Sequence, residues 1–92
     1  MQKIIEKQEV PPEIEGLGDY FVAIYLKCSD LVSRRQVQDI TDLYSRRTLA
    51  NLDSEGQGPA ESLLIGRTIY YPRAVLVLWL ASKVKSRNRR KA

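Results

Sequence analysis

One predicted helix face within residues 45–56 carries side chains whose types and spacing suit hydrogen bonding to the edges of nucleic-acid bases. Its members follow the three- and four-residue rhythm of a helix surface. They are Arg47, Ala50, Asn51 and Ser54. Arginine donates two bonds to guanine and asparagine bonds adenine bidentately, which suits a helix in the major groove. A solvated helix face with ordinary arginines is the alternative, and this short stretch leaves both open.

Two short helices joined by a tight turn are predicted to position this face. Ser33 and Gln36 form a capping box, in which each side chain bonds the backbone N–H of the other residue. The first helix is therefore expected to begin at Arg34 and to stop near Asp42. Ser45 is expected to cap the second helix in the same way.

The second helix is predicted to have a core side as well as its polar face. Leu49 and Leu52 have the spacing of a buried stripe, and Gly56 ends the helix because glycine adopts the left-handed conformation at little cost. Arg46 and Thr48 are expected to hold phosphates, since a helix N-terminus attracts anions. The expected DNA contacts of the two helices are Arg34, Arg35, Ser45, Arg46, Arg47, Thr48, Ala50, Asn51 and Ser54.

A β-hairpin is predicted to follow the helix pair. Strand-like runs at 62–65 and 68–71 flank Gly66 and Arg67, a two-residue connection with glycine first, which is typical of a type II′ turn. Arg67 at the tip is expected to enter a narrow minor groove or to grip the phosphates beside it. An exposed turn arginine without a ligand is the alternative.

The composition indicates one small domain and excludes several kinds of site. Its 92 residues support a single core, and 43% apolar with 28% charged residues is typical of a soluble globular protein. Cys28 is the only cysteine and histidine is absent, so neither a metal site nor a cofactor is expected. Without histidine or a recognisable carboxylate motif, the chain is not expected to be an enzyme.

Positive charge is concentrated in the part that holds the helix pair. The net charge is +4, but residues 1–30 hold three lysines and six acids, whereas residues 31–92 hold twelve basic residues and five acids. A basic lobe attracts polyanions, so double-stranded DNA is the leading expected partner. No run is apolar enough to span a bilayer and no signal peptide is recognisable, so a cytoplasmic location without membrane contact is expected.

Residues 1–18 are predicted to form an extended arm with a short strand around Ile4 and Ile5. This apolar pair is expected to contact a neighbouring protomer, head-to-tail, on DNA. The DNA-binding domain is expected at residues 19–82. Its first segment, 20–26, is rich in β-branched and aromatic residues and is predicted to be a strand, with a short helix capped by Asp19 as the alternative.

A third helix and a basic tail are expected after the hairpin. Pro72 suits the first helical position, and residues 74–81 are apolar on every side. Such a helix needs cover from the 20–26 segment or from another protomer, and a strand is the alternative for this run. Residues 83–92 are expected to lie along phosphates as a tail. The expected tail contacts are Lys83, Lys85, Arg87, Arg89, Arg90 and Lys91.

Several short segments between Leu31 and Leu80 together carry a resemblance to a known family. They are Leu31-Val32-Ser33, Ser45-Arg46-Arg47-Thr48-Leu49, Glu55-Gly56-Gln57-Gly58-Pro59, Ile65-Gly66-Arg67, and Tyr71 followed by Trp79-Leu80. With them, this stretch resembles the MerR-like winged-helix domains of small excisionases and related phage regulators. It departs from them in the turn between the helices, where Asp42 stands in a segment that usually has glycine and that is one residue longer here.

This resemblance implies an α+β fold, a small winged helix-turn-helix with the hairpin as its wing and a C-terminal helix. It also implies an excisionase, or recombination directionality factor, that binds cooperatively near an attachment site, bends DNA and biases a tyrosine integrase toward excision. A transcriptional regulator of a phage or mobile element with the same fold is the first alternative. A protein-interaction module that docks through residues 74–81 without binding DNA is the second. The residues implied in major-groove binding are Arg46, Arg47, Thr48 and Asn51, with Arg67 in the minor groove.

Overall fold

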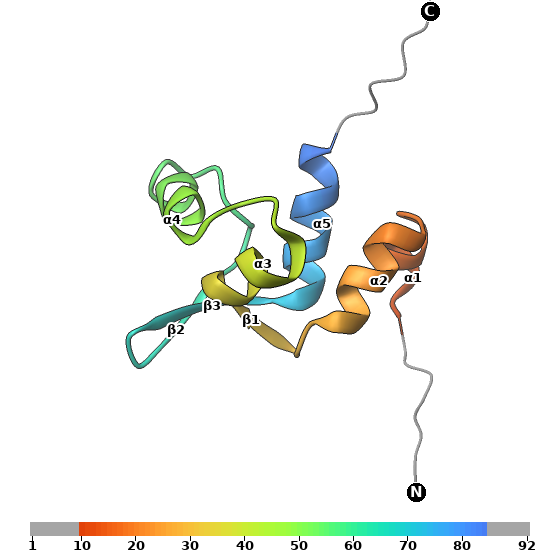
Figure 1. The fold of residues 1–92 in the computed structure, drawn as a ribbon, viewed down its shortest axis with the longest axis horizontal. Helices are drawn as coiled ribbons and strands as arrows, with labels where there is room; N and C mark the ends of the chain where they lie inside the picture. Colours follow the sequence, from red (N-terminus) through yellow and green to blue (C-terminus); the bar gives the residue numbers. More distant parts are fainter. Residues whose placement is uncertain (1–9, 85–92) are drawn as a thin grey trace, which may run out of the picture.

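Residues 10–84 are the part of the chain that the computed structural model describes (Figure 1). This part contains five helices and one antiparallel sheet of three strands, so the expected α+β class is confirmed. The helices are α1 (Pro12–Glu15), α2 (Asp19–Lys27), α3 (Arg34–Thr41), α4 (Arg46–Ser54) and α5 (Arg73–Lys83), and the strands are β1 (Leu31–Ser33), β2 (Leu63–Ile65) and β3 (Thr68–Pro72).

The sheet joins the helix pair to the hairpin. β3 is the central strand, with β1 on one side and β2 on the other. Gly66 in the β2–β3 turn has φ +65°, whereas Arg67 is not among the described residues with positive φ, as expected for a type II′ turn. The predicted two-residue hairpin is confirmed. Because β1 runs directly into α3, its pairing with β3 fixes the hairpin relative to the helices.

The segment predicted as a strand at residues 20–26 is instead helix α2. Its N-cap is Gly18 and no side chain caps it, so the cap proposed for Asp19 in the helical alternative is not formed. Ile24, Tyr25 and Cys28 are buried, and their spacing places them on one side of a helix. α2 packs with this side on α5. Tertiary packing therefore overrides the strand preference of the β-branched and aromatic residues.

The expected extended arm is wrong for residues 12–15, which form the single turn α1. Pro12 occupies its first helical position, where the missing N–H costs nothing. The Ile14 side chain is 0% exposed and belongs to the core, where α1 packs on α2 and α5. Ile4 and Ile5, the expected protomer contact, lie outside the described residues.

α5 begins at Arg73, one residue later than predicted, because Pro72 is its N-cap and the last residue of β3. Leu76 and Leu80 are buried, and α2 and α1 both pack on the helix. The strand alternative is therefore wrong, and cover by the 20–26 segment is confirmed. Arg73 ties the start of α5 to the end of α2, because its Nη1 donates to the Cys28 carbonyl at 3.0 Å. No helix within residues 10–84 has the length and apolar character needed to cross a membrane.

Candidate nucleic-acid interface

Side-chain caps set the start of α3 where the sequence predicts it. The Gln36 N–H donates to Ser33 Oγ at 3.2 Å, and the Ser33 N–H donates to Gln36 Oε1 at 2.9 Å. The capping box is therefore complete. α3 begins at Arg34 and ends at Thr41, which confirms both predicted limits.

The turn between α3 and α4 is held by Asp42 and Gln38. Asp42 has φ +58°, a left-handed conformation that aspartate adopts more readily than most residues. It thus supplies a left-handed conformation at a position where glycine would be the usual residue. Gln38 Oε1 accepts a hydrogen bond from the Arg46 N–H at 2.9 Å. This bond satisfies one of the free N–H groups at the start of α4 and ties the two helices together.

α4 is capped at both ends, as predicted, although Ser45 forms a single N-cap bond and not the reciprocal box seen at Ser33. The Thr48 N–H donates to Ser45 Oγ at 3.1 Å. At the other end, Gly56 has φ +76° and the Gln57 N–H donates to the Leu52 carbonyl at 2.8 Å, which is the Schellman arrangement. The Ser45 cap therefore fixes the first turn of α4, which carries the predicted DNA contacts Arg46, Arg47 and Thr48.

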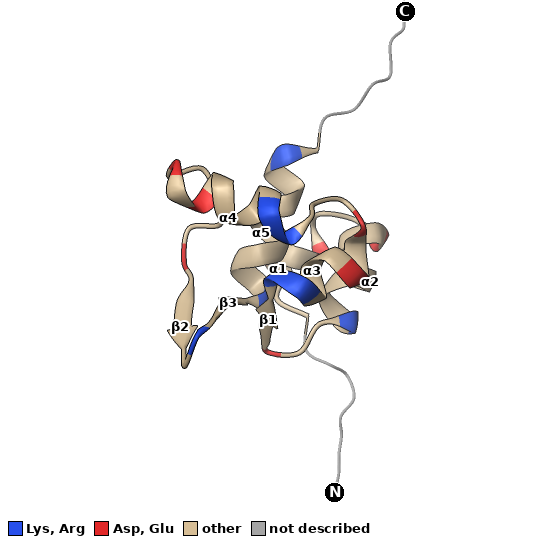
Figure 2. Ribbon diagram, turned by 60° about the vertical axis from the view of Figure 1, so that its left-hand side comes forward, with Lys and Arg blue, Asp and Glu red and all other residues tan. Residues whose placement is uncertain are grey.

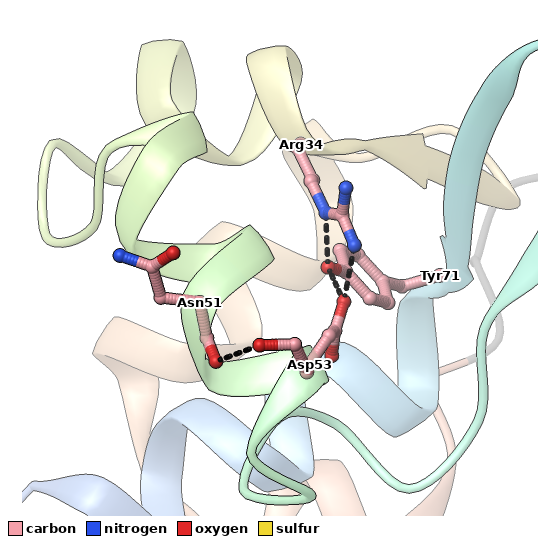
Figure 3. A network of polar contacts seen from close by, with 5 residues as sticks. Arg34, Asn51, Asp53 and Tyr71 are labelled. Carbon is pink, nitrogen blue, oxygen red and sulfur yellow. Dashed lines mark hydrogen bonds and ion pairs between the residues drawn. The ribbon is translucent and has the colours of Figure 1, made fainter.

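The two sides of α4 differ as the sequence predicts. Leu49 is fully buried, whereas Arg47 and Asn51 are exposed. Ala50 between them is half-buried, and the exposed Ser54 donates its hydroxyl to the Asn51 carbonyl at 3.0 Å. The Asn51 amide points away from the polar contacts at the C-terminal end of the helix (Figure 3). The polar face is thus open to a ligand, and base reading by Arg47 and Asn51 stays a prediction.

A polar network joins α3, α4 and β3 (Figure 3). Asp53 Oδ2 accepts from Arg34 Nη2 and from the Tyr71 hydroxyl, each at 2.6 Å, while Arg34 Nε donates to the Tyr71 oxygen at 2.9 Å. Sequence reasoning missed Asp53 and Tyr71 and assigned Arg34 to DNA alone. One signal was present: a carboxylate in the last turn of a helix is unfavourable with the helix dipole, so it implies a cationic partner.

The network changes the ionisation of its members. Burial, and then the hydrogen bond to the Asp53 carboxylate, raise the pKa of Tyr71 to about 12. Burial by itself lowers the pKa of Arg34, but hydrogen bonds to Asp53 and Tyr71 outweigh it, and the net pKa is raised. Arg34 therefore stays charged, with two of its three guanidinium nitrogens already donating to the protein.

The Tyr71 hydroxyl predicts a specific loss of stability at high pH. Its folded pKa lies above the ordinary value of 10.0, so its contribution is fully present below pH 10 and is lost as the pH rises toward 12. We expect the free energy of unfolding, measured with urea, to fall by about 2 kcal/mol over this interval because of Tyr71 alone. Tyr71→Phe should remove that part of the pH dependence, whereas Tyr20→Phe, at an exposed position, should retain it. Equal pH profiles for the Tyr71→Phe variant and the parent would contradict the assignment.

A hollow of about 590 Å³ lies between the start of α4 and the hairpin. Five arginines from three parts of the fold line it, and no lining residue is acidic. Figure 2 shows basic residues on the hairpin and near the centre of its view, and acidic residues at the C-terminal end of α4. An arginine cluster without carboxylates has the chemistry of a phosphate-binding surface. The lining residues are Ser33, Arg34, Arg35, Arg46, Arg47, Ala50, Arg67, Thr68, Ile69 and Tyr70.

The hollow, called the arginine hollow below, gathers only part of the predicted site. Four predicted contacts of α4 and its cap lie outside the lining, namely Ser45, Thr48, Asn51 and Ser54. Lys83, expected in the basic tail, is the last residue of α5, and its Nζ lies 5.7 Å from the centre of the Trp79 ring. The other tail residues, Lys85, Arg87, Arg89, Arg90 and Lys91, lie outside the described residues.

Comparisons with protein-family models, with curated proteins and with solved structures found no match for this chain. The geometry of α4, the hairpin and the arginine hollow is therefore the basis for a functional assignment.

Proposed function

We propose that this chain binds double-stranded DNA, with α4 in the major groove and the β2–β3 hairpin, as a wing, against the adjacent minor groove. The observation that carries the proposal is the arginine hollow between these two elements. In this arrangement, the sugar-phosphate backbone that separates the major from the minor groove would lie along the arginine hollow. The arrangement of a helix pair, a three-stranded sheet and a hairpin is compatible with a winged helix-turn-helix domain.

The two arginines that open α4 have different proposed roles. Arg46 stands in the first turn, where its own N–H is already bonded to Gln38 and where the helix N-terminus attracts phosphate. Arg47 begins the exposed face that continues to Asn51. We therefore assign phosphate binding to Arg46 and base reading to Arg47 and Asn51.

Fluorescence anisotropy of a labelled duplex, titrated over a range of salt concentrations, tests the proposal. Each phosphate contact adds about −0.9 to the slope of log K against log[salt]. Arg34 is paired with Asp53 and Arg47 is assigned to base reading, so the other three arginines of the hollow predict a slope of roughly −2 to −3. Lys27→Ala removes an exposed charge from α2 and serves as the control, with an unchanged slope. Salt-independent binding, or none, would refute the proposal.

The finer proposal is an excisionase that acts with a tyrosine integrase. It rests on the resemblance described for residues 31–80 and on the DNA-binding surface proposed above. An excision assay with purified integrase and a linear attachment-site substrate tests it, and addition of this protein should be needed for efficient excision. Binding to the DNA without stimulation of excision would favour a transcriptional regulator instead.

Neighbouring protomers are proposed to contact one another on DNA through Ile4 and Ile5. A deletion that tests this contact must end before Ile14, because the Ile14 side chain belongs to the core. We therefore expect deletion of residues 1–9 to keep the affinity for one site and to abolish cooperativity on adjacent sites. The full-length double variant Ile4→Ser and Ile5→Ser should behave in the same way. Cooperativity equal to that of the parent in both variants would rule out the contact.

A further inference from the structure

β2 is one of the two edge strands of the sheet, and all three of its residues are apolar and exposed. Leu64 is 67% exposed and Ile65 51%, the first being the most exposed of the large hydrophobic side chains in the described residues. Edge strands are ordinarily protected by charge, proline or a bulge. β2 has none of these within Leu63–Ile65, so the strand is suited to contact with another molecule.

The surroundings of β2 indicate what that molecule is. Arg67 follows Ile65 after one glycine, and the arginine hollow begins at the same turn, since Arg67 and Thr68 line it. The hairpin projects away from the helical body at the left of Figure 1, on the same side as α4. A protein partner at this strand would have to match both the exposed apolar side chains and the concentrated positive charge beside them. A polyanion with apolar groups inside its groove is the complementary surface, and the DNA minor groove is one.

We infer that Leu64 and Ile65 form an apolar wedge that enters the minor groove and partly unstacks one base step. This inference rests on the proposed DNA binding and deepens it. Arg67 at the tip would be attracted by the negative potential of the narrow minor groove. Successive strand residues project to opposite faces of the hairpin, so Leu64 and Ile65 would meet different parts of the groove. Leu64, the more exposed of the two, is the inserting side chain, and Ile65 lies against the sugar wall. Proteins that insert such wedges kink the duplex.

Two spectroscopic measurements on one duplex test the wedge. The duplex is the best binder selected from random sequence, with fluorophores at its ends for energy transfer and 2-aminopurine placed in turn at each step of the minor-groove flank. The parent protein should bend this DNA by about 20–90° and raise 2-aminopurine emission at one step, because insertion unstacks the base. Leu64→Ala with Ile65→Ala should bring the bend below about 20° and abolish the rise in emission.

Controls separate the wedge from charge and from folding. Both wedge side chains are exposed, so the double variant should keep the circular dichroism spectrum and thermal midpoint of the parent. Its salt slope should also be unchanged, because no phosphate contact is lost. Leu26→Ala, on α2 and 50% exposed, is the matched control and should bend DNA as the parent does.

Three results would overturn the inference, and they are distinguishable. DNA bound by the double variant with the parent's bend and 2-aminopurine signal would show that the hairpin does not insert, while DNA binding itself would stand. A loss of cooperativity with an unchanged bend would show that the β2 edge receives another protomer. Absence of DNA binding by the parent protein would refute the proposed function and the wedge together.

Discussion

Arg47→Ala is expected to weaken binding to the preferred DNA site by about 1–3 kcal/mol, roughly five- to 150-fold, and to relax the preference at one base pair. The reason is geometric. Arg47 lies on the exposed face of α4 that continues to Asn51, and this face is held in place by the Ser45 cap and by Leu49 in the core. Random DNA should be bound almost as well as before, because the contact that is lost reads a base.

The adjacent Arg46 provides the matched control for Arg47. Both are exposed arginines in the first turn of α4, so their replacement by alanine removes the same charge and a similar side chain. Arg46→Ala should weaken specific and random DNA alike and reduce the salt slope by about 0.9, as expected for one lost phosphate contact. The measurement is anisotropy on a selected and a scrambled duplex. Equal losses on both duplexes for both variants would show that Arg47 does not read a base.

Local signals in the sequence were sufficient for the elements that make up the candidate site. The Ser33 box, the Ser45 cap, Gly56 and the Gly66 turn each act within a few residues, so their effect on the backbone is nearly independent of the rest of the fold. The helix pair and the hairpin were therefore predicted within one residue at most of their limits.

Features that depend on distant contacts could not be predicted in this way. The 20–26 segment is short and apolar, and its helical form is stabilised by packing of Ile24 and Tyr25 in the core with α5. Ile14 follows a double proline and is buried only because α2 and α5 meet beside it. The arginine hollow likewise combines residues from Ser33 to Tyr70, and no local rule shows that these segments are neighbours.

The Arg34–Asp53–Tyr71 network is the contact whose loss should cost the fold most among the polar groups described. Its members come from α3, α4 and β3, which are the three elements that set the hairpin relative to α4. The side chains of Arg34 and Asp53 are 25% and 19% exposed, so solvent screens the pair only partly. Removal of Asp53 leaves a half-buried guanidinium and a buried hydroxyl without their shared acceptor.

We therefore expect Asp53→Ala to lower the free energy of unfolding by about 2–3 kcal/mol, somewhat less than the loss of a fully buried ion pair. Part of this cost is offset, because a carboxylate is removed from the unfavourable C-terminal end of α4. Tyr71→Phe, which keeps the buried ring and removes only one donor, should cost about 1 kcal/mol. Asp39→Ala, at an exposed position of α3, is the control and should stay within about 0.5 kcal/mol of the parent.

A double-mutant cycle with Arg34→Ala isolates the coupling between the two charges. A working ion pair predicts a coupling free energy above about 1 kcal/mol, and a value below about 0.5 kcal/mol would show that the contact contributes nothing beyond packing. Gly58→Ala tests the same network without changing any of its members. A Cβ at position 58 would lie 1.9 Å from Asp53 Oδ1 and would displace the carboxylate. If Asp53 holds Arg34 and Tyr71 as described, Gly58→Ala should destabilise the parent strongly and the Asp53→Ala variant much less, since the obstructing carboxylate is then absent.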